Sequence, residues 1–324
     1  MERFQYSPSH AKLCMTLSAM AYAGPMSAIE WLLADPGLPT NEEWELQWYG
    51  AAGENALFCA WNKNSGAYAI SVRGSVWKEF SNIFEDVDVV NVSPWHNGYI
   101  AKGIWDGLQN LVSILNASGH SIIPYLRETC FQHKEVPTIF ITGHSLGGAL
   151  ANALSLYIQE QLGRPVNLIV YTFGAPGIGD ATFTAYYDQI FNTMLCQAFR
   201  VYNDKDVIPY AYGDLQEIIP ENLPVATKGM LNFFWDNSIR VFMKILLEMD
   251  RKYVQIGPYT HVLSNAAMRV RPYDILPTPP VNRGAELKSW FTYEHGVNTY
   301  LYLLETPLLP ALPYPVPISE TEEA

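Results

Sequence analysis

The residues best suited to chemistry in this sequence lie at 143–147, where the chain runs Gly-His-Ser-Leu-Gly. This segment has the form G-x-S-x-G, in which the two glycines leave room for a sharp turn around the serine. A run of β-branched and aromatic residues, 139–142, comes before it, and a helical pattern follows to about Leu162. Strand, turn and helix in this order predict a nucleophile elbow that presents the hydroxyl of Ser145 above a sheet.

A serine nucleophile needs a base, and the base needs a carboxylate that orients it and stabilises its charged form. The loop 203–209 leaves the carboxyl end of a predicted strand, Gln197–Tyr202, and carries Asp204 and Asp206. Catalytic groups gather at such strand ends in open α/β sheets. We take Asp206 as the carboxylate and keep Asp204 as the alternative; both residues are also common in ordinary turns.

Two histidines follow these aspartates and satisfy the order Ser…Asp…His that α/β-hydrolases use. His295 lies at the start of a predicted final helix, whereas His261 lies in a Tyr-Thr-His-Val segment at 259–262. We take His295 as the base, because a residue at the mouth of a terminal helix is easily presented to a site. His144, inside the elbow, is expected to point away from the serine hydroxyl.

Acyl transfer also needs hydrogen-bond donors aimed at the developing oxyanion. In α/β-hydrolases one donor is the N–H of the residue after the nucleophile, here Leu146, and the second comes from a loop after an earlier strand. Ser75 follows the predicted strand Tyr68–Arg73 and is placed for that second role. The alternative is an ordinary turn at the end of the strand.

Two amphipathic segments suggest covers for the site. Residues 76–87 have apolar residues at helical spacing, which fits either a surface helix or a lid that opens on a lipid surface. The segment 212–258 looks inserted and contains a long amphipathic helix from Met230 to Tyr253, which either packs on the domain or forms a second cap. The apolar lid candidates are Trp77, Phe80, Ile83 and Phe84.

The pattern of elements predicts an α/β fold with a mostly parallel central sheet flanked by helices. We expect one domain over residues 1–305, interrupted by the insertion at 212–258, and a proline-rich tail over 306–324. Helices are expected at 8–23, 26–34, about 101–115, about 120–131, 146 to about 162, from about 183, and after His295; strands are expected at 44–49, 56–61, 68–73, before the elbow, at 166–173 and at 197–202.

Composition narrows the class of protein. The chain has 324 residues, 49% hydrophobic residues and a net charge of −12, which favours a sizeable core and argues against a nucleic-acid partner. The start of the chain lacks the pattern of a signal peptide, and no run of about 18 apolar residues suggests a transmembrane helix. Localisation stays open between the cytoplasm and secretion as a processed chain, and the oligomeric state stays unknown.

Cysteine and histidine usage points away from metal sites and disulfides. Cys14, Cys59, Cys130 and Cys196 are scattered along the chain, so we expect free and mostly buried thiols. The remaining histidines show no spacing typical of metal ligands, and no cofactor is expected. His10, His96, His120 and His133 are interpreted as structural or surface residues.

Taken together, these stretches resemble the lipase class 3 family, the group that contains the triacylglycerol lipases of filamentous fungi. The similarity covers roughly residues 50–210 and, weakly, the C-terminal histidine. Ser145 occupies a position similar to that of the family's nucleophile. The segment 259–262 is similar to a family segment that precedes the catalytic histidine and does not supply the base. The matching stretches are Val72–Ser75, His96–Tyr99, Ile141–Leu150, Tyr171–Pro176 with Gly179, Asp206–Pro209, and His295.

The resemblance implies a carboxylic-ester hydrolase that acts on acylglycerols, touches a lipid–water interface transiently and uses Ser145, Asp206 and His295 as a triad. It implies Ser75 and Leu146 as oxyanion donors and 76–87 as the lid. The motifs leave open a phospholipase A1, a galactolipase or a feruloyl-type esterase of the same fold. A lipase-like binding or signalling protein without catalysis is the alternative from a different class.

Overall fold

The computed structural model of the protein describes residues 5–74, 88–132, 135–206, 208–210, 213, 253–263 and 294–309. Within these ranges the helices are α1 (Pro8–Met20), α2 (Met26–Leu33), α4 (Lys102–Ser113), α5 (Ile122–Thr129), α6 (Leu146–Leu162), α7 (Ala181–Ile190) and α12 (Val297–Leu303), with a short 3-10 helix η1 at Ile208–Tyr210. The strands are β1 (Trp44–Ala52), β2 (Asn55–Asn62), β3 (Tyr68–Val72), β4 (Val92–Trp95), β5 (Gly98–Ala101), β6 (Thr138–His144), β7 (Asn167–Phe173), β8 (Cys196–Asn203) and β9 (Tyr259–Leu263).

The central sheet is mostly parallel, as the sequence predicts. Its described strands follow the order β1-β2-β3-β6-β7-β8-β9. The pairs β1/β2 and β2/β3 are antiparallel, whereas β3/β6, β6/β7, β7/β8 and β8/β9 are parallel. The carboxyl ends of β3, β6, β7 and β8 therefore meet at one edge of the sheet, where α/β folds collect their ligand and catalytic groups.

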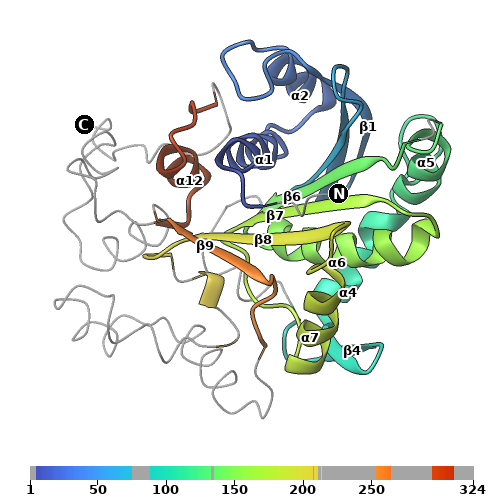
Figure 1. The fold of residues 1–324 in the computed structure, drawn as a ribbon, viewed down its shortest axis with the longest axis vertical. Helices are drawn as coiled ribbons and strands as arrows, with labels where there is room; N and C mark the ends of the chain where they lie inside the picture. The colour runs from blue at the N-terminus through green and yellow to red at the C-terminus, as the bar shows by residue number, and fades with distance from the viewer. Residues whose placement is uncertain are drawn as a thin grey trace, which may run out of the picture.

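Helices cover both faces of this sheet (Figure 1). On one face α1, α2 and α12 enclose a core cluster that includes Leu17, Phe173 and Tyr300. On the other face α4, α5, α6 and α7 enclose a second cluster, which includes Leu108 and Leu154. Because β6 and β7 are covered on both sides, every residue after the first of each strand is buried, as expected for strands in the middle of a covered sheet.

Short polar side chains fix α1 on the sheet. Ser18 Oγ lies 2.8 Å from Thr142 Oγ1 of β6, and Ser71 Oγ of β3 donates to the Leu17 carbonyl at 2.9 Å. All three side chains are buried, so these hydrogen bonds satisfy groups that would otherwise lose water without a partner. This packing sets the register of α1 and brings Tyr22, just beyond its end, to the carboxyl edge of the sheet.

Two features of the fold were not predicted. The segment around His96 forms a small antiparallel hairpin, β4 with β5, which turns through His96 at a φ of 53° before α4 begins. The edge strand β9 pairs parallel to β8 and includes His261. The predicted helices at 76–87 and 230–253 lie outside the described residues, except that Tyr253 is described and buried.

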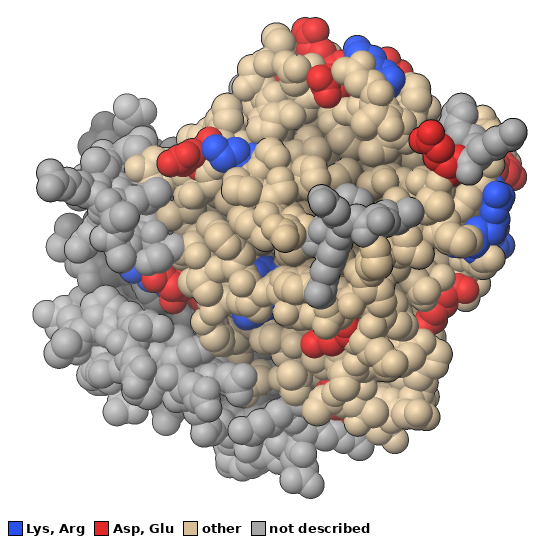
Figure 2. All heavy atoms as spheres, in the orientation of Figure 1, with Lys and Arg blue, Asp and Glu red and all other residues tan. Residues whose placement is uncertain are grey.

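On the face that Figure 2 shows, the charged side chains of the described residues are scattered, with wide uncharged areas between them and no continuous basic patch. None of the described helices combines the length and apolarity needed to span a bilayer. Near the end of the described chain, Thr306 and Leu309 are buried, so the first residues of the predicted tail pack on the core.

The cysteines are free and buried, which confirms the sequence prediction. Burial raises the pKa of the Cys130 thiol to about 12 and raises the pKa values of Cys14, Cys59 and Cys196 as well. Since the thiolate is the reactive form, we predict that folded protein at pH 8 barely reacts with a disulfide reagent such as DTNB. Protein unfolded in guanidinium should react with four equivalents of DTNB, one for each free cysteine. Rapid reaction of a thiol in the folded protein would contradict this.

Candidate active site

Ser145 lies on a sharp turn between β6 and α6, with φ 61° and ψ −132°. This backbone conformation is rare for any residue other than glycine and costs about 1–3 kcal/mol when it is enforced. Hydrogen bonds on both sides hold it. The Ser145 N–H donates to the Phe173 carbonyl at 2.9 Å, and the Ser145 carbonyl accepts from Gly148 and Ala149 in the first turn of α6. The predicted elbow is therefore present.

The glycines of the pentapeptide are required by close backbone approaches. A Cβ on Gly143 would lie 2.2 Å from the Gly147 carbonyl oxygen, and a Cβ on Gly147 would lie 2.4 Å from the Val72 oxygen of β3. Neither contact can be relieved by moving a flexible side chain, because the opposing atoms belong to backbone. The sequence pattern thus reflects the packing of the turn against β3 and against its own helix.

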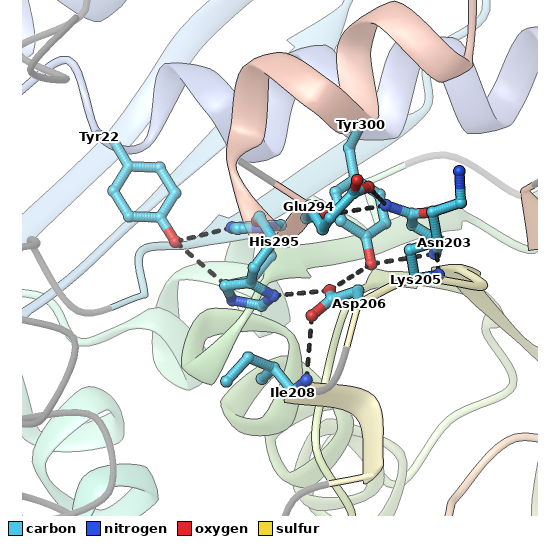
Figure 3. Close-up of polar contacts among 9 residues, drawn as sticks. Tyr22, Asn203, Lys205, Asp206, Ile208, Glu294, His295 and Tyr300 are labelled. Carbon is cyan, nitrogen blue, oxygen red and sulfur yellow. Dashed lines mark hydrogen bonds and ion pairs between the residues drawn. The ribbon is translucent and has the colours of Figure 1, made fainter. Parts of the chain in front are cut away.

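Asp206 presents a buried carboxyl group whose two oxygens both accept hydrogen bonds (Figure 3). Oδ1 accepts from the Ile208 N–H at 2.9 Å. Oδ2 accepts from His295 Nδ1 at 2.7 Å and from the Tyr300 hydroxyl at 2.6 Å. The orientation of the carboxyl group is fixed by these three donors, two of which come from the last described segment of the chain.

The two candidate histidines lie in different surroundings. The His295 side chain is almost fully buried and paired with Asp206. His261 lies on β9, where its ring stacks on Tyr6 with a centroid distance of 3.9 Å. Of the two aspartates, Asp206 contacts His295, whereas Asp204 donates its backbone N–H to the Leu263 carbonyl. The geometry therefore brings together the favoured members of each pair.

Tyr300 and Gly174 complete the surroundings of this pair. Burial, followed by the charge of Asp206, holds the pKa of Tyr300 well above its ordinary value, so the phenol stays a hydrogen donor to the carboxylate. Gly174, which follows β7, has a φ of 58°. A Cβ there would lie 2.8 Å from the Tyr300 hydroxyl, 2.9 Å from Asp206 Oδ2 and 3.1 Å from His295 Cε1.

Neighbouring hydrogen bonds connect Ser145 to this cluster. Its N–H is bonded to Phe173, the residue before Gly174, and the adjacent His144 bonds through Nε2 to the His295 carbonyl at 2.7 Å. Ser145 Oγ is buried and has no hydrogen-bond partner in the described part of the protein. The elbow, the carboxylate and the imidazole thus occupy the same edge of the sheet.

Of the two predicted oxyanion donors, the structure describes Leu146 but not Ser75. Leu146 is the first residue of α6, where a backbone N–H has no partner within its own helix. Gly74, the last residue described after β3, lies against the elbow, since a Cβ there would be 2.8 Å from the His144 oxygen. Ser75 and the lid candidates Trp77, Phe80, Ile83 and Phe84 lie outside the described residues.

Sequence reasoning missed four residues that hold the site together: Tyr22, Asn203, Gly174 and Tyr300. The Asn203 side chain donates to the Glu294 carbonyl at 3.0 Å and to the Glu294 carboxylate at 2.7 Å. Its backbone N–H contacts the Tyr300 hydroxyl at 3.1 Å. Only Gly174 carried a signal, as a glycine directly after a buried strand; the others act through contacts distant in sequence.

Metal ligation finds no support among the residues described, since none of them form a group of three or more His, Cys, Asp or Glu side chains able to hold an ion. The arrangement that is present can do acid–base and nucleophilic chemistry: a hydroxyl on an elbow and an imidazole bonded to a carboxylate.

Comparison with solved structures defines the class of fold. The structure titled M37 lipase superimposes with a TM-score of 0.68 over 93% of both chains, at 21% sequence identity. Together with the sheet order and the elbow, this likeness shows that the protein has the α/β-hydrolase fold.

Comparison of sequences shows which family this chain is similar to. The family model described as lipase (class 3) matches residues 69–215. A lipase from Rhizomucor miehei is 34% identical over 131 residues, 36% of this chain and 35% of the relative. A chloroplastic/mitochondrial phospholipase A1, EG1, from Oryza sativa subsp. indica is 32% identical over 127 residues, 39% of this chain and 26% of that one. The matched segment thus spans about a third or less of these curated relatives.

The crowding at Gly174 yields a test of the site. We predict that Gly174→Ala lowers kcat/KM for ester hydrolysis by at least about 100-fold, because the new methyl group displaces the Asp206–His295 pair. Steady-state kinetics on a soluble ester measures this.

Gly163→Ala is the matched control. Gly163 also has positive φ, at 65°, but among the described residues no atom beyond its chain neighbours and its own helix backbone lies within 4 Å of the new Cβ. This variant should lose about 1–2 kcal/mol of unfolding free energy, measured by denaturant titration, and keep its activity. Equal kcat/KM in the two variants would show that Gly174 does not act through the pair.

Proposed function

We propose that this protein is a serine carboxylic-ester hydrolase that acts on acylglycerols. The observation that carries the proposal is that a serine on a strained elbow and a buried histidine–aspartate pair lie at the same edge of the sheet. The match of residues 69–215 to class 3 lipases supports the same conclusion. In this proposal Ser145 is the nucleophile, His295 the base and Asp206 the group that orients the base.

The reaction begins when Ser145 Oγ attacks the ester carbonyl carbon and His295 Nε2 takes the hydroxyl proton. A carbon–oxygen bond forms, and the carbonyl electron pair moves onto the oxygen. Collapse of this tetrahedral species breaks the bond to the alcohol, which leaves with the proton held by His295. The acyl group is then bonded to Ser145, and a glycerol-type alcohol has been released.

Water completes the cycle. It attacks the acyl carbon while His295 accepts its proton, and the second tetrahedral species collapses with the Ser145 oxygen as leaving group. His295 returns the proton to that oxygen, and a fatty acid is released. In both halves the backbone N–H groups of Leu146 and Ser75 stabilise the oxyanion; the placement of Leu146 at the start of α6 supports the first of these roles.

The substrate is proposed to be a lipid ester met at a lipid–water interface, with residues 76–87 as the lid. Within the proposal, residues 1–305 form one hydrolase domain, 212–258 an insertion and 306–324 a tail. A phospholipase A1 activity is the second candidate, favoured by the similarity to the rice enzyme. Galactolipase and feruloyl-type esterase activities need the same machinery and differ in the substrate groove.

Activity on p-nitrophenyl esters tests the proposal. We predict hydrolysis by the wild type and a loss of at least about 1,000-fold in kcat for Ser145→Ala, because the nucleophile is gone. Ser113→Ala, which removes an exposed hydroxyl at the end of α4, is the matched control and should keep full activity. Residual activity of Ser145→Ala near the wild-type level would exclude the proposed mechanism and favour a binding protein.

A panel of lipids separates the substrate classes. Fatty-acid release should be fastest from emulsified tri- or diacylglycerol and slower from phosphatidylcholine, a galactolipid and a feruloyl ester, as measured by titration at constant pH. Faster release from the phospholipid, with cleavage at the sn-1 position, would replace the first candidate by the second.

A further inference from the structure

His144, the residue just before the elbow serine, makes a contact that the proposed mechanism does not use. Its side chain is fully buried, and Nε2 lies 2.7 Å from the backbone oxygen of His295. A carbonyl oxygen can only accept a hydrogen bond, so Nε2 must carry the hydrogen. The nucleophile's neighbour thereby holds the main chain of the proposed base.

The other nitrogen of His144 points to the tautomer. Burial, and then the neighbouring charge of His295, keep the pKa of His144 well below its usual value, so its ring is neutral and carries a single N–H. With that hydrogen on Nε2, Nδ1 is an acceptor. The Tyr22 hydroxyl donates to the His144 carbonyl oxygen at 3.1 Å and lies 3.3 Å from Nδ1, so its single hydrogen can be shared between these two acceptors.

The segment that carries His295 needs such support. Helix α12 has seven residues, and its N-cap Gly296 offers no side-chain cap. Short helices are not stable by themselves, so tertiary contacts must fix this segment. Two consecutive carbonyls are held from the sheet: Glu294 O by Asn203 Nδ2 at 3.0 Å and His295 O by His144 Nε2 at 2.7 Å.

We propose that His144 is a positioning residue whose Nε2–H holds the His295 carbonyl, and that Tyr22 keeps His144 in the tautomer that can do so. The inference rests on the proposed function, because it explains how the base is kept in reach of Ser145. Tyr22 lies on the side opposite to Tyr300 (Figure 3), so the support that passes through His144 and the hydrogen bond from Tyr300 to Asp206 come from opposite sides of the histidine–aspartate pair.

The charge state of His144 is part of this role. The rings of His144 and His295 have a centroid distance of 4.7 Å, and the Tyr300 ring lies 5.3 Å from His144. Catalysis converts His295 to an imidazolium. A charged neighbour at this distance would oppose that step, whereas a neutral imidazole donates to the backbone without adding positive charge. The group beside Nδ1 is the Tyr22 phenol, which does not stabilise an imidazolium as a carboxylate would.

The tautomer can be observed directly in protein with ¹⁵N-labelled histidine. In a neutral imidazole the protonated and unprotonated nitrogens resonate far apart, and His144 is assigned by loss of its signals in His144→Gln. The expected result is a hydrogen on Nε2 of His144 in the wild type and a shift toward the Nδ1–H tautomer in Tyr22→Phe. A wild-type His144 with its hydrogen on Nδ1 would overturn the proposal, whatever the activity of the protein.

Kinetics tests the consequence. Tyr22→Phe should lower kcat for a soluble ester by about tenfold, with KM changed less than about twofold, since the loss concerns the base and not substrate binding. Tyr68→Phe removes a comparable tyrosine hydrogen bond, to the Thr129 carbonyl at 3.4 Å, and should keep wild-type kcat. Unchanged kcat in Tyr22→Phe would overturn the role given to Tyr22.

Two substitutions of His144 separate positioning from packing. Gln has an N–H donor about as far along the side chain as Nε2 and should restore most of the activity, whereas His144→Leu fills the space without a donor and should lose about 100-fold in kcat. Equal kcat in the two variants would overturn the proposal. Should His144→Leu fail to fold, the Gln and Tyr22→Phe variants still decide it. Failure of the proposed function is seen separately, as activity that survives in Ser145→Ala.

Discussion

The candidate site depends on one backbone constraint: Ser145 is held at a φ of 61° between a strand and a helix. The strain costs about 1–3 kcal/mol and persists because the surroundings leave no alternative. The N–H of Ser145 is bonded to β7, its carbonyl starts α6, and glycines at 143 and 147 allow backbone contacts that a methyl group would block. This strained turn places Ser145 beyond the end of the strand, at the edge of the sheet.

The order and direction of the strands bring the other residues of the candidate site to the same edge. Parallel strands β6, β7 and β8 end side by side, and each contributes at its end: the elbow after β6, Gly174 after β7, and Asn203 with Asp206 after β8. The last described segment then lies across these ends. Its contacts to His144, Asn203 and Asp206 hold His295 at the same sheet edge as Ser145, which lies 150 residues earlier in the chain. A seven-residue helix could not define that position by itself.

Much of the sheet was predictable because its signals are local. The apolar strands β6 and β7, the glycines of the elbow and the long helix α6 each have a pattern in their own residues. The edge strand β9 did not, since Tyr259–Leu263 is short and mixes polar with apolar residues. The β4–β5 hairpin contains Pro94 and has a histidine at a turn position of positive φ, where asparagine, aspartate or glycine is usual.

The candidate site divides in the same way. Ser145 followed from its own neighbours, and Asp206 and His295 from chain order and position after a strand or before a helix. The residues that brace them could not be predicted, because Tyr22, His144 and Tyr300 gain their roles only from contacts across more than 90 residues of sequence. In a sequence each of them is indistinguishable from an ordinary core residue.

The central claim is that the imidazole of His295 makes the hydroxyl of Ser145 reactive, and its most direct test is the rate of covalent labelling by a fluorophosphonate. The modified residue is identified by peptide mass spectrometry. The account predicts one adduct, on Ser145, in the wild type and a labelling rate lower by at least about 1,000-fold in His295→Ala. Labelling of Ser145 at equal rates in both proteins, or no labelling of Ser145 in the wild type, would contradict it.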